Sequence, residues 1–357
     1  MSFFSFTQKP FLIAGPCSAE SREQLLETAA ALSGLPVRLF RAGVWKPRSR
    51  PGFFEGRGSE ALQWLAAVKA QSGWPVATEV AEPAHVEAAL RHGIDAVWLG
   101  ARTTVNPFDV QRIADALSGV SIPVLVKNPV SPDVDLWLGA IERLQQKGIT
   151  DIAAVHRGFT SYQASPSYRN PPNWPVPIEL RRRRPDLPII CDPSHMAGRR
   201  DGVASLSQKA MDMGFEGLMI ETHPDPDAAL SDAQQQLKPE ALRALLAQLV
   251  IRHTRPETHS AELEYLRQFM DSLDAEIIEL IARRTELSRQ MGYVKKALDM
   301  TAYQPERWRE IVETRSRHAM SKNLEADFII SIFQKIHDES IRLQLGILEA
   351  REDGGGE

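Results

Sequence analysis

The segment LPIICDPSH, residues 187–195, begins as an apolar, β-prone run and ends in side chains that bind metals and phosphates. On an extended strand, Cys191 and His195 would point to the same side but lie about 13 Å apart, at about 3.3 Å per residue. They cannot share one ion without a sharp bend in the chain. A cysteine ligand that accompanies His195 is therefore expected from another segment.

Candidate partners for His195 stand at or just after the ends of other apolar runs. Cys17 ends the first run, Glu221 ends the last, and Asp232 follows in the segment ALSDAQQQL. A set of thiolate, imidazole and carboxylates suits a divalent transition metal that accepts soft and hard ligands together. The same residue types also surround phosphate sites, so the composition of the set leaves both interpretations open.

Cations form a second candidate group. Six of them follow apolar runs in the first half of the chain: Arg41, Lys46, Arg48, Arg102, Lys127 and Arg157. This much positive charge exceeds the need of one carboxylate and suits two phosphate-bearing substrates, or one phosphate and one carboxylate. General solubility is the alternative, but it does not explain why the cations stand at one end of the runs.

The elements that must position these residues repeat along the first 250 residues. Short apolar runs alternate with longer amphipathic segments, and the runs are 11–17, 37–43, 75–80, 96–101, 123–129, 152–158, 188–194 and 217–223. Such alternation is typical of a parallel sheet covered on both faces. Eight units of this length predict an α/β fold, a closed (β/α)8 TIM barrel whose strand ends converge on one face. A doubly wound open sheet is the alternative, but GPCSAE poorly matches the glycine-rich turn that it needs.

The pattern changes after residue 249. RHTRPETHS, residues 252–260, is polar and predicts a linker, and no strand pattern follows it. Residues 263–298 predict one helix with a heptad stripe: Leu266, Met270, Leu273, Ile277, Leu280, Leu287, Met291 and Val294. Two further helices are expected through residues 307–320 and 326–350. The first helix, at about 50 Å, is too long for a compact domain and is expected to pack along a partner.

Arg284 occupies the missing position of the heptad stripe. An arginine at a core position is costly unless it meets an anion. Arg267 and Lys295 flank the stripe, and on the third helix Ser340 and Gln344 interrupt the apolar line. A polar interior lined by cations predicts a pocket for a small polyanion. A polar residue that sets the register of a coiled coil is the alternative.

The bulk composition is typical of soluble globular proteins. The chain has 357 residues, enough for two domains, and a net charge of -4, which argues against general nucleic-acid binding. No apolar run reaches membrane-spanning length, and the first residues lack the features of a signal peptide. The two cysteines do not form a disulfide framework, so a reducing cytoplasm is the expected location.

The motifs of the first unit are jointly similar to those of 3-deoxy-D-arabino-heptulosonate-7-phosphate (DAHP) synthases of the type I-beta branch. They follow the family's order over residues 10–250: GPCS (15–18), RAGVWKPRS (41–49), LGAR (99–102), VLVK (124–127), HRG (156–158), DPSH (192–195), IETH (220–223) and ALSDAQQQL (229–237). A related enzyme makes 3-deoxy-octulosonate 8-phosphate from arabinose 5-phosphate and normally has Asn before the arginine of the KPR segment. Lys46-Pro47-Arg48 therefore favours the erythrose 4-phosphate enzyme.

The resemblance implies a role for each candidate residue. One divalent metal ion, with Mn²⁺ favoured over Fe²⁺, Co²⁺ and Zn²⁺, would be held by Cys17, His195, Glu221 and Asp232. Phosphoenolpyruvate would be bound by Arg41, Lys46, Ala101, Arg102, Lys127 and Arg157. Erythrose 4-phosphate would be bound by Arg48, Ser49 and Asp192. Lys46 is also expected to carry a proton in catalysis, because neighbouring cations lower the pKa of a lysine.

Two departures from the family pattern affect this assignment. Ser49-Arg50 stand where Thr-Ser is usual, and Asn128-Pro129 follow the lysine of VLVK. The first is expected to alter contacts to the sugar phosphate, and neither removes a core charge. Cys191 is expected to be a packed strand residue.

Residues 263–348 resemble all-helical chorismate mutases in the segments LRQFMDSLDAEIIELIARRTELSRQMGYVKK, PERW and HDESIRLQ. The resemblance implies that chorismate or prephenate is bound by Arg284, Lys295, Gln304, Arg307, Ser340 and Gln344, with Arg267 supplied by the other subunit of an intertwined dimer. Arg284, Lys295 and Gln344 would be catalytic, the last two by stabilising charge on the ether oxygen. Trp308 stands where the family usually has a Glu that binds the substrate hydroxyl. Either Glu306 or Glu310 replaces it, or the mutase is slow.

The sequence thus predicts a bifunctional enzyme: a synthase barrel in residues 1–251, a linker in 252–260, a mutase in 261–350 and a disordered tail in 351–357. The reactions would be the condensation of phosphoenolpyruvate with erythrose 4-phosphate and the rearrangement of chorismate to prephenate. Prephenate or chorismate bound in the mutase would inhibit the barrel, and the chain would be at least a dimer that binds neither nucleic acid nor membrane. The alternatives are a mutase domain that is mainly regulatory, and a barrel of the octulosonate type.

Overall fold

The computed structural model describes residues 3–4, 9–46, 52–161, 167–252 and 260–349. The chain separates into two compact units, Met1–Arg255 and Pro256–Glu357, and each is described by itself. Except for its two end residues, the expected linker 252–260 lies outside the described residues. The expected tail 351–357 lies wholly outside them.

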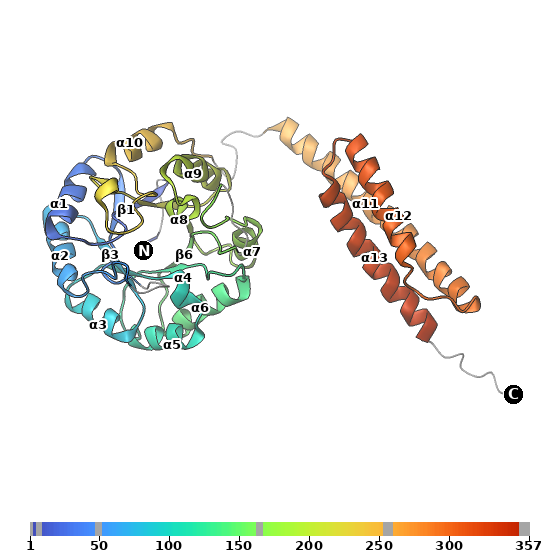
Figure 1. Ribbon diagram of the computed structural model, residues 1–357, viewed down its shortest axis with the longest axis horizontal. Helices are drawn as coiled ribbons and strands as arrows, with labels where there is room; N and C mark the ends of the chain where they lie inside the picture. The colour runs from blue at the N-terminus through green and yellow to red at the C-terminus, as the bar shows by residue number, and fades with distance from the viewer. Residues whose placement is uncertain (1–2, 5–8, 47–51, 162–166, 253–259, 350–357) are drawn as a thin grey trace. The chain divides into compact units, whose positions relative to one another are not determined.

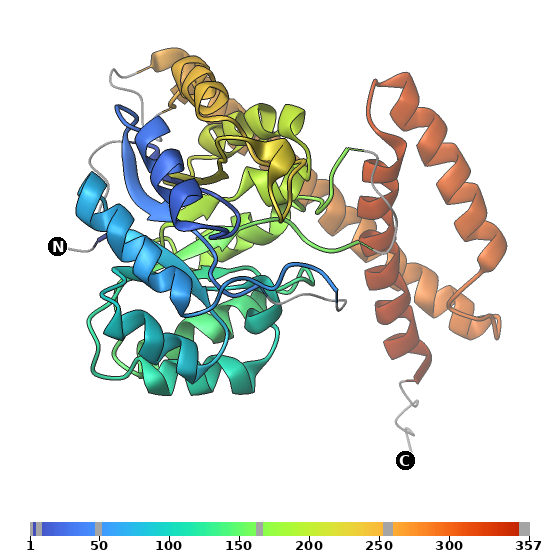
Figure 2. The same cartoon turned by 60° about the vertical axis from the view of Figure 1, so that its left-hand side comes forward.

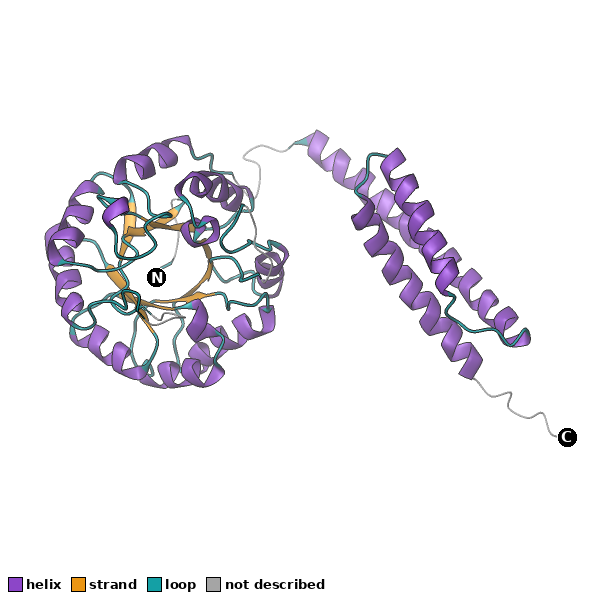
Figure 3. Ribbon diagram, in the orientation of Figure 1, coloured by secondary structure: helices purple, strands orange, loops and turns teal. Residues whose placement is uncertain are grey.

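The first unit is a closed parallel barrel, as predicted, and not an open sheet (Figures 1 and 3). Its strands are β1 (Phe11–Gly15), β2 (Val37–Arg41), β3 (Val76–Val80), β4 (Ala96–Leu99), β5 (Val124–Lys127), β6 (Ile152–His156), β7 (Ile189–Cys191) and β8 (Gly217–Glu221). β1 pairs with both β2 and β8, which closes the ring. At this closure Gly15 lies opposite Glu221, so the ends of the first and last strands meet.

Helices surround the barrel and bury the apolar outer faces of its strands (Figure 1). They are α1 (Arg22–Ala31), α2 (Glu60–Ser72), α3 (Pro83–Arg91), α5 (Pro107–Ala116), α6 (Val134–Gln146), α7 (Pro175–Arg183), α9 (Val203–Asp212) and α10 (Pro239–Gln248). Shorter elements follow β4, β7 and β8: α4 (Ala101–Thr104), α8 (Pro193–Ala197), η1 (Arg200–Gly202) and η2 (Pro226–Ala228). Polar caps fix several starts, as where the Asp133 side chain accepts a hydrogen bond from Leu136 N.

The inside of the barrel is filled by alternate residues of the strands. Apolar side chains form a separate inner core: Phe4, Phe11, Ile13, Leu39, Ala77, Ala96, Trp98, Leu125, Ala153, Val155, Ile190 and Met219. Side chains alternate between the two faces of a strand. The residue two positions after an inner-core residue of the same strand therefore also faces inward. Those positions include Arg41, Glu79, Lys127 and Glu221. The same inward-facing side of the strands thus supplies the apolar core and, at the strand ends, charged side chains that face the open end of the barrel.

The second unit is all-helical, with α11 (Ala261–Ala297), α12 (Pro305–Ser321) and α13 (Ala326–Glu349). The Ser260 side chain caps α11 by accepting from Leu263 N, and Pro305 opens α12. α13 lies against both other helices, and Figure 2 shows the three from another side. The heptad stripe of α11, from Leu266 to Val294, remains between 38% and 59% exposed. No helix of the described chain is long and apolar enough to cross a membrane.

His156 ends β6 and points away from the barrel interior, among four aromatic rings. The rings belong to Trp137, Phe159, Trp174 and Phe215, with centroids between 5.3 and 6.3 Å from that of His156. The side chain is fully buried, and neither ring nitrogen has a hydrogen-bond partner among the described residues. Burial lowers the pKa of His156 to about 3, and the nearby backbone of Pro172 offsets this only in part.

This depressed pKa predicts acid sensitivity. The folded protein keeps His156 neutral, whereas the unfolded chain binds a proton below a pH of about 6.5. The neutral, buried His156 therefore contributes its full stabilisation above a pH of about 6.5, and this stabilisation is lost as the pH drops toward 3. Between pH 7 and pH 5 we expect the native chain to lose about 2 kcal/mol more unfolding free energy than His156→Phe. Urea unfolding at both pH values measures this, with His92→Phe as the control. Equal losses in the native chain and His156→Phe would contradict it.

Candidate active sites

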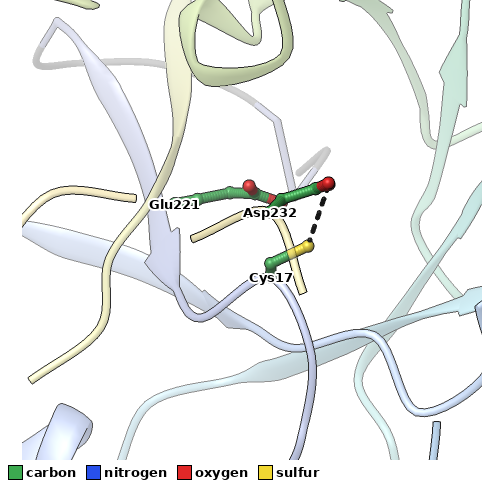
Figure 4. A group of neighbouring side chains, drawn as sticks. All are labelled: Cys17, Glu221 and Asp232. Atoms are coloured by element: carbon green, nitrogen blue, oxygen red, sulfur yellow. Dashed lines mark hydrogen bonds between the residues drawn. The ribbon is translucent and has the colours of Figure 1, made fainter. Parts of the chain in front are cut away.

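The mouth of the barrel gathers a thiol and two carboxylates that are distant in the sequence. Ligand atoms of Cys17, Glu221 and Asp232 all lie within 4.8 Å of one another, and Figure 4 shows the Cys17 thiol directed at the Asp232 carboxylate. Cys17 Sγ is 3.4 Å from Asp232 Oδ2. Cys17 follows β1, Glu221 ends β8, and the two strands are paired, so barrel closure brings these residues together.

His195 borders this group from α8. The side chain of Asp192 caps the helix by accepting from His195 N, and an oxygen of the same carboxylate lies 2.8 Å from His195 Nδ1. The other ring nitrogen, Nε2, lies 3.7 Å from Glu221 Oε1 and 3.8 Å from Asp232 Oδ2. The structure thus brings the four expected metal ligands into one neighbourhood. Cys191 ends β7, is buried against Met196 and lies outside the group of three, as expected of a packed strand residue. The extended path assumed from Cys191 to His195 is wrong, because the strand ends at Cys191 and His195 lies in α8.

The protonation states of the group reflect its burial. Burial raises the pKa of the Cys17 thiol to about 12, and the Glu221 carboxylate adds to the effect. Burial also opposes ionisation of Asp232, but His195 and Arg169 hold the pKa of that carboxyl well below its usual value. The donor set of thiol, imidazole and carboxylates fits a divalent transition metal, whose charge would favour the thiolate over the thiol.

Arg41 and Glu221 form a buried ion pair across the mouth. Their side chains are 1% and 0% exposed, and Arg41 NH1 lies 2.9 Å from Glu221 Oε1. Arg41 NH2 donates to the carbonyl of Cys17, and the guanidinium lies 4.7 Å from the centre of the Trp98 ring. Its Nε has no partner among the described residues. A buried donor of this kind is available to a bound anion.

Lys127 and Lys46 are also tied to the ligand group. Lys127 Nζ donates to Asp192 Oδ2 at 2.8 Å, and Lys46 Nζ lies 3.0 Å from Cys17 Sγ. The expected net fall in the pKa of Lys46 is wrong, although burial and the neighbouring Arg41 do act in that direction. Burial alone would lower it, but the adjacent Cys17 and the Glu221 carboxylate raise the pKa above its usual value. Lys46 is therefore an ammonium donor and not a ready base.

Arg157 is affected by its burial and by two positive neighbours. Burial is the main cause that lowers its pKa to about 10, Asp192 opposes the shift, and Arg169 and Arg102 add to it. Arg102 lies in α4 directly after Ala101. Asn128, one of the departures from the family pattern, accepts from the backbone N of Arg157 at 2.7 Å and so positions it. The expected sugar-phosphate residues Arg48 and Ser49 lie outside the described residues.

Sequence reasoning missed three polar residues of this mouth. Arg169 NH1 donates to Asp232 Oδ1 at 3.0 Å and to Gln235 Oε1 at 2.9 Å, and Gln235 Nε2 donates to Glu221 Oε2 at 2.8 Å. Asn170 accepts from Arg157 NH1. Gln235 lies in the quoted ALSDAQQQL motif, but SYRNPPNW, which holds Arg169 and Asn170, has neither strand nor helix periodicity. No pattern in that segment could have marked them.

The helical unit holds a cavity of about 220 Å³. Its walls combine cations and neutral polar groups with apolar side chains: Arg284, Leu287, Ser288, Met291, Lys295, Ala302, Gln304, Arg307, Ile311, His337, Ser340, Ile341 and Gln344. Arg284 NH1 donates to Ser340 Oγ at 2.8 Å, and Lys295 Nζ donates to Gln344 Oε1 at 2.9 Å. Burial, and then the nearby Arg315, lower the pKa of Arg284. Arg284 and Lys295 have only neutral hydrogen-bond partners among the described residues, and such a pair of cations suits a polyanion.

Trp308, Glu306 and Glu310 do not line this cavity. The Trp308 ring stacks on His337 with centroids 4.6 Å apart, and Glu310 accepts from Arg307 NH1 at 2.5 Å. His337 is the ring that faces the cavity in that region. Arg267 is 62% exposed, and the structure does not bring it to the cavity of its own chain. Within the described chain, the lining of the cavity contains no carboxylate.

Comparison with known proteins assigns both units. The model of the DAHP synthetase I family matches residues 7–254, and that of chorismate mutase type II matches residues 266–345. A phospho-2-dehydro-3-deoxyheptonate aldolase of Thermotoga maritima is 34% identical over 238 residues, which cover 67% of this chain and 68% of the relative. A 2-dehydro-3-deoxyphosphooctonate aldolase of Aromatoleum aromaticum is 31% identical over 268 residues, which cover 68% of this chain and 90% of the relative.

A solved structure extends this likeness to the fold. The crystal structure of a DAHP synthase from Thermotoga maritima superposes with a TM-score of 0.60 at 33% identity, covering 67% of each chain. This coverage agrees with a match through the barrel, since the family model also spans about that share. Two catalytic activities follow from the matched families, an aldolase-type transferase and an isomerase. The chain therefore belongs to the DAHP synthetase I family and carries a chorismate mutase domain of type II after its barrel.

Proposed function

We propose that the barrel condenses phosphoenolpyruvate with D-erythrose 4-phosphate to DAHP, with the help of a divalent metal ion. The observation that carries the proposal is the single mouth in which the ligand group of Cys17, Glu221 and Asp232 lies beside buried cations. Cys17, His195, Glu221 and Asp232 would hold the ion, and Mn²⁺ is the proposed metal. Lewis-acid polarisation of the sugar aldehyde is the chemistry that such an ion supplies when bound.

The residues of the mouth divide the remaining work. Arg41, Lys46, Ala101, Arg102, Lys127 and Arg157 would bind the phosphate and the carboxylate of phosphoenolpyruvate. An anion beside Arg157 would offset the repulsion that Arg102 and Arg169 exert on it. Lys46, kept protonated next to Cys17, would donate a proton during the addition. Arg48, Ser49 and Asp192 would hold erythrose 4-phosphate, Asp192 through the sugar hydroxyls.

The helical cavity would convert chorismate to prephenate. The rearrangement needs no covalent catalysis, because fixing the two carboxylates in a folded conformer supplies much of the acceleration. Arg284, Arg307 and the partner's copy of Arg267 would bind the carboxylates, with Gln304 and Ser340 as further contacts. Lys295 and Gln344, already 2.9 Å apart, would stabilise charge on the ether oxygen.

A dimer would complete this cavity. The exposed heptad stripe of α11 would pack against the same helix of a second copy, because an apolar face of this length is unfavourable in water. Ligand bound between the helices would then inhibit the barrel by favouring one arrangement of the two units. Prephenate is the proposed inhibitor, since the cavity that would bind it is already present.

The metal proposal predicts separate responses of the two activities. Chelation is expected to abolish DAHP formation and leave chorismate turnover unchanged, because the described lining of the helical cavity offers one histidine, His337, and no cysteine or carboxylate to hold an ion with it. His195→Ala should lower DAHP formation by more than about 100-fold, whereas His92→Ala, at the far end of α3, should not. Both activities are measured on one preparation. Full DAHP formation by chelated His195→Ala protein would contradict the proposal.

The substrate proposal separates the two kinds of relatives. Erythrose 4-phosphate is expected to be turned over with phosphoenolpyruvate, and arabinose 5-phosphate is not, because Lys46-Pro47-Arg48 matches the heptulosonate enzymes. Mass spectrometry of the products formed from each sugar checks this. Formation of the eight-carbon product alone would show that the barrel is of the octulosonate type.

The dimer proposal predicts the effect of one buried charge. Leu273→Asp places a charge on the apolar stripe and is expected to shift the chain to a monomer. Mutase activity should then fall by at least about 100-fold, because the cavity loses the partner's copy of Arg267 and the same chain cannot replace it. Sedimentation velocity and chorismate turnover measure both effects. Ser272→Asp places the same charge on the polar face of α11 and should change neither. A Leu273→Asp dimer with full activity would rule the arrangement out.

The feedback proposal predicts that one substitution removes two properties. Arg284→Ala is expected to abolish mutase turnover and also the inhibition of DAHP formation by prephenate, because one pocket serves both. The control is Arg289→Ala on the same helix, where the arginine pairs with Glu286 at the surface and does not line the cavity. If prephenate still inhibits DAHP formation in the Arg284→Ala chain, regulation runs through another site.

A further inference from the structure

Arg169 connects two parts of the barrel mouth that the proposed function treats separately. On one side, its NH1 donates to Asp232 Oδ1 at 3.0 Å and to Gln235 Oε1 at 2.9 Å. Gln235 in turn donates to Glu221 Oε2 at 2.8 Å. One nitrogen of Arg169 thus fixes two of the expected metal ligands, Asp232 directly and Glu221 through Gln235. Such supporting hydrogen bonds orient ligands and strengthen metal binding.

On its other side, Arg169 adjoins the proposed anion site. Its charge contributes, after burial, to the lowered pKa of Arg157. The next residue, Asn170, accepts from Arg157 NH1 at 2.8 Å and donates to the carbonyl of His195 at 2.6 Å. Two consecutive residues of one loop therefore contact both the arginine of the anion site and the segment that carries His195.

The guanidinium of Arg169 is held in place and still accessible. Arg169 N donates to the carbonyl of Ala197, and its Cβ lies over Gly198, where an added Cβ would approach it to 2.4 Å. The side chain is nevertheless 48% exposed. In the described part of the chain its side-chain hydrogen bonds use NH1. The Nε and NH2 edge of this planar group is thus open to a ligand.

We propose that Arg169 couples the binding of the metal ion to the binding of phosphoenolpyruvate. Its NH1 holds Asp232 for the metal ion, while Nε and NH2 bind the phosphoryl group of phosphoenolpyruvate beside Arg157. The inference rests on the proposed synthase function. A rigid fork that serves both sites is oriented by whichever ligand binds first, so each ligand favours binding of the other by the same factor. A lysine at this position would offer one point charge and could not bridge them.

Titration calorimetry of the full-length chain tests the coupling. Mn²⁺ is titrated with and without phosphoenolpyruvate, and phosphoenolpyruvate with and without Mn²⁺. In the native chain we expect each ligand to tighten the other by about 10-fold. Arg169→Met is expected to weaken both ligands by about 10-fold and to reduce the coupling factor to about 1. Arg169→Lys should recover part of the phosphoenolpyruvate affinity but not the coupling.

Arg199→Met is the matched control, because Arg199 is 51% exposed and pairs with Asp201 just after α8. It should leave both affinities and the coupling unchanged. Unchanged coupling in Arg169→Met overturns the inference, even if Mn²⁺ binding alone is weakened, since Arg169 would then only support Asp232. A native chain that binds no Mn²⁺ contradicts the proposed metal instead. The phosphoenolpyruvate affinity of Arg169→Met then decides alone, and an unchanged value overturns the inference.

Discussion

Closure of the parallel barrel is the constraint on which the synthase unit depends. Side chains alternate along each strand, so the residues that fill the inner core dictate which later residues face the mouth. Leu39 is followed inward by Arg41, Leu125 by Lys127 and Met219 by Glu221. A register slip of one residue would turn these charges toward the surrounding helices. The apolar core and the polar site therefore cannot vary independently of each other.

Charge balance is the second condition for such an enclosed mouth. Buried charges are stable only when they are paired and hydrogen-bonded. Arg41 meets Glu221, and Lys127 meets Asp192, in pairs that are almost fully buried. Arg157 has no such ion pair among the described residues, and burial, followed by the charges of Arg169 and Arg102, lowers its pKa although Asp192 opposes the shift. An anion bound beside Arg157 would offset this excess of positive charge.

The helical unit also places cations in an enclosed site, but these cations are less deeply buried than those of the barrel. Its three helices enclose a cavity with cations at its wall, yet the apolar stripe of α11 stays exposed in the single chain. Trp308 does not reach the cavity but stacks on His337, so the residue that departs from the mutase pattern supports the wall instead of contacting a ligand. In the single chain the stripe is thus left exposed, and Arg267 does not line the cavity.

The sequence by itself determined the elements, because their signals are periodic and local. Apolar runs marked all eight strands, charged residues after them marked the mouth, and the heptad stripe marked α11. Only the tertiary structure decided what depends on neighbours far along the chain. Arg169 lies in a loop without periodicity and reaches Asp232 only because the barrel closes. The pKa of Lys46 rises where sequence reasoning expected a fall, since Cys17 and the Glu221 carboxylate together outweigh burial and Arg41. Local sequence patterns determine which face of a strand or helix a side chain lies on, whereas closure of the barrel determines which residues it contacts there.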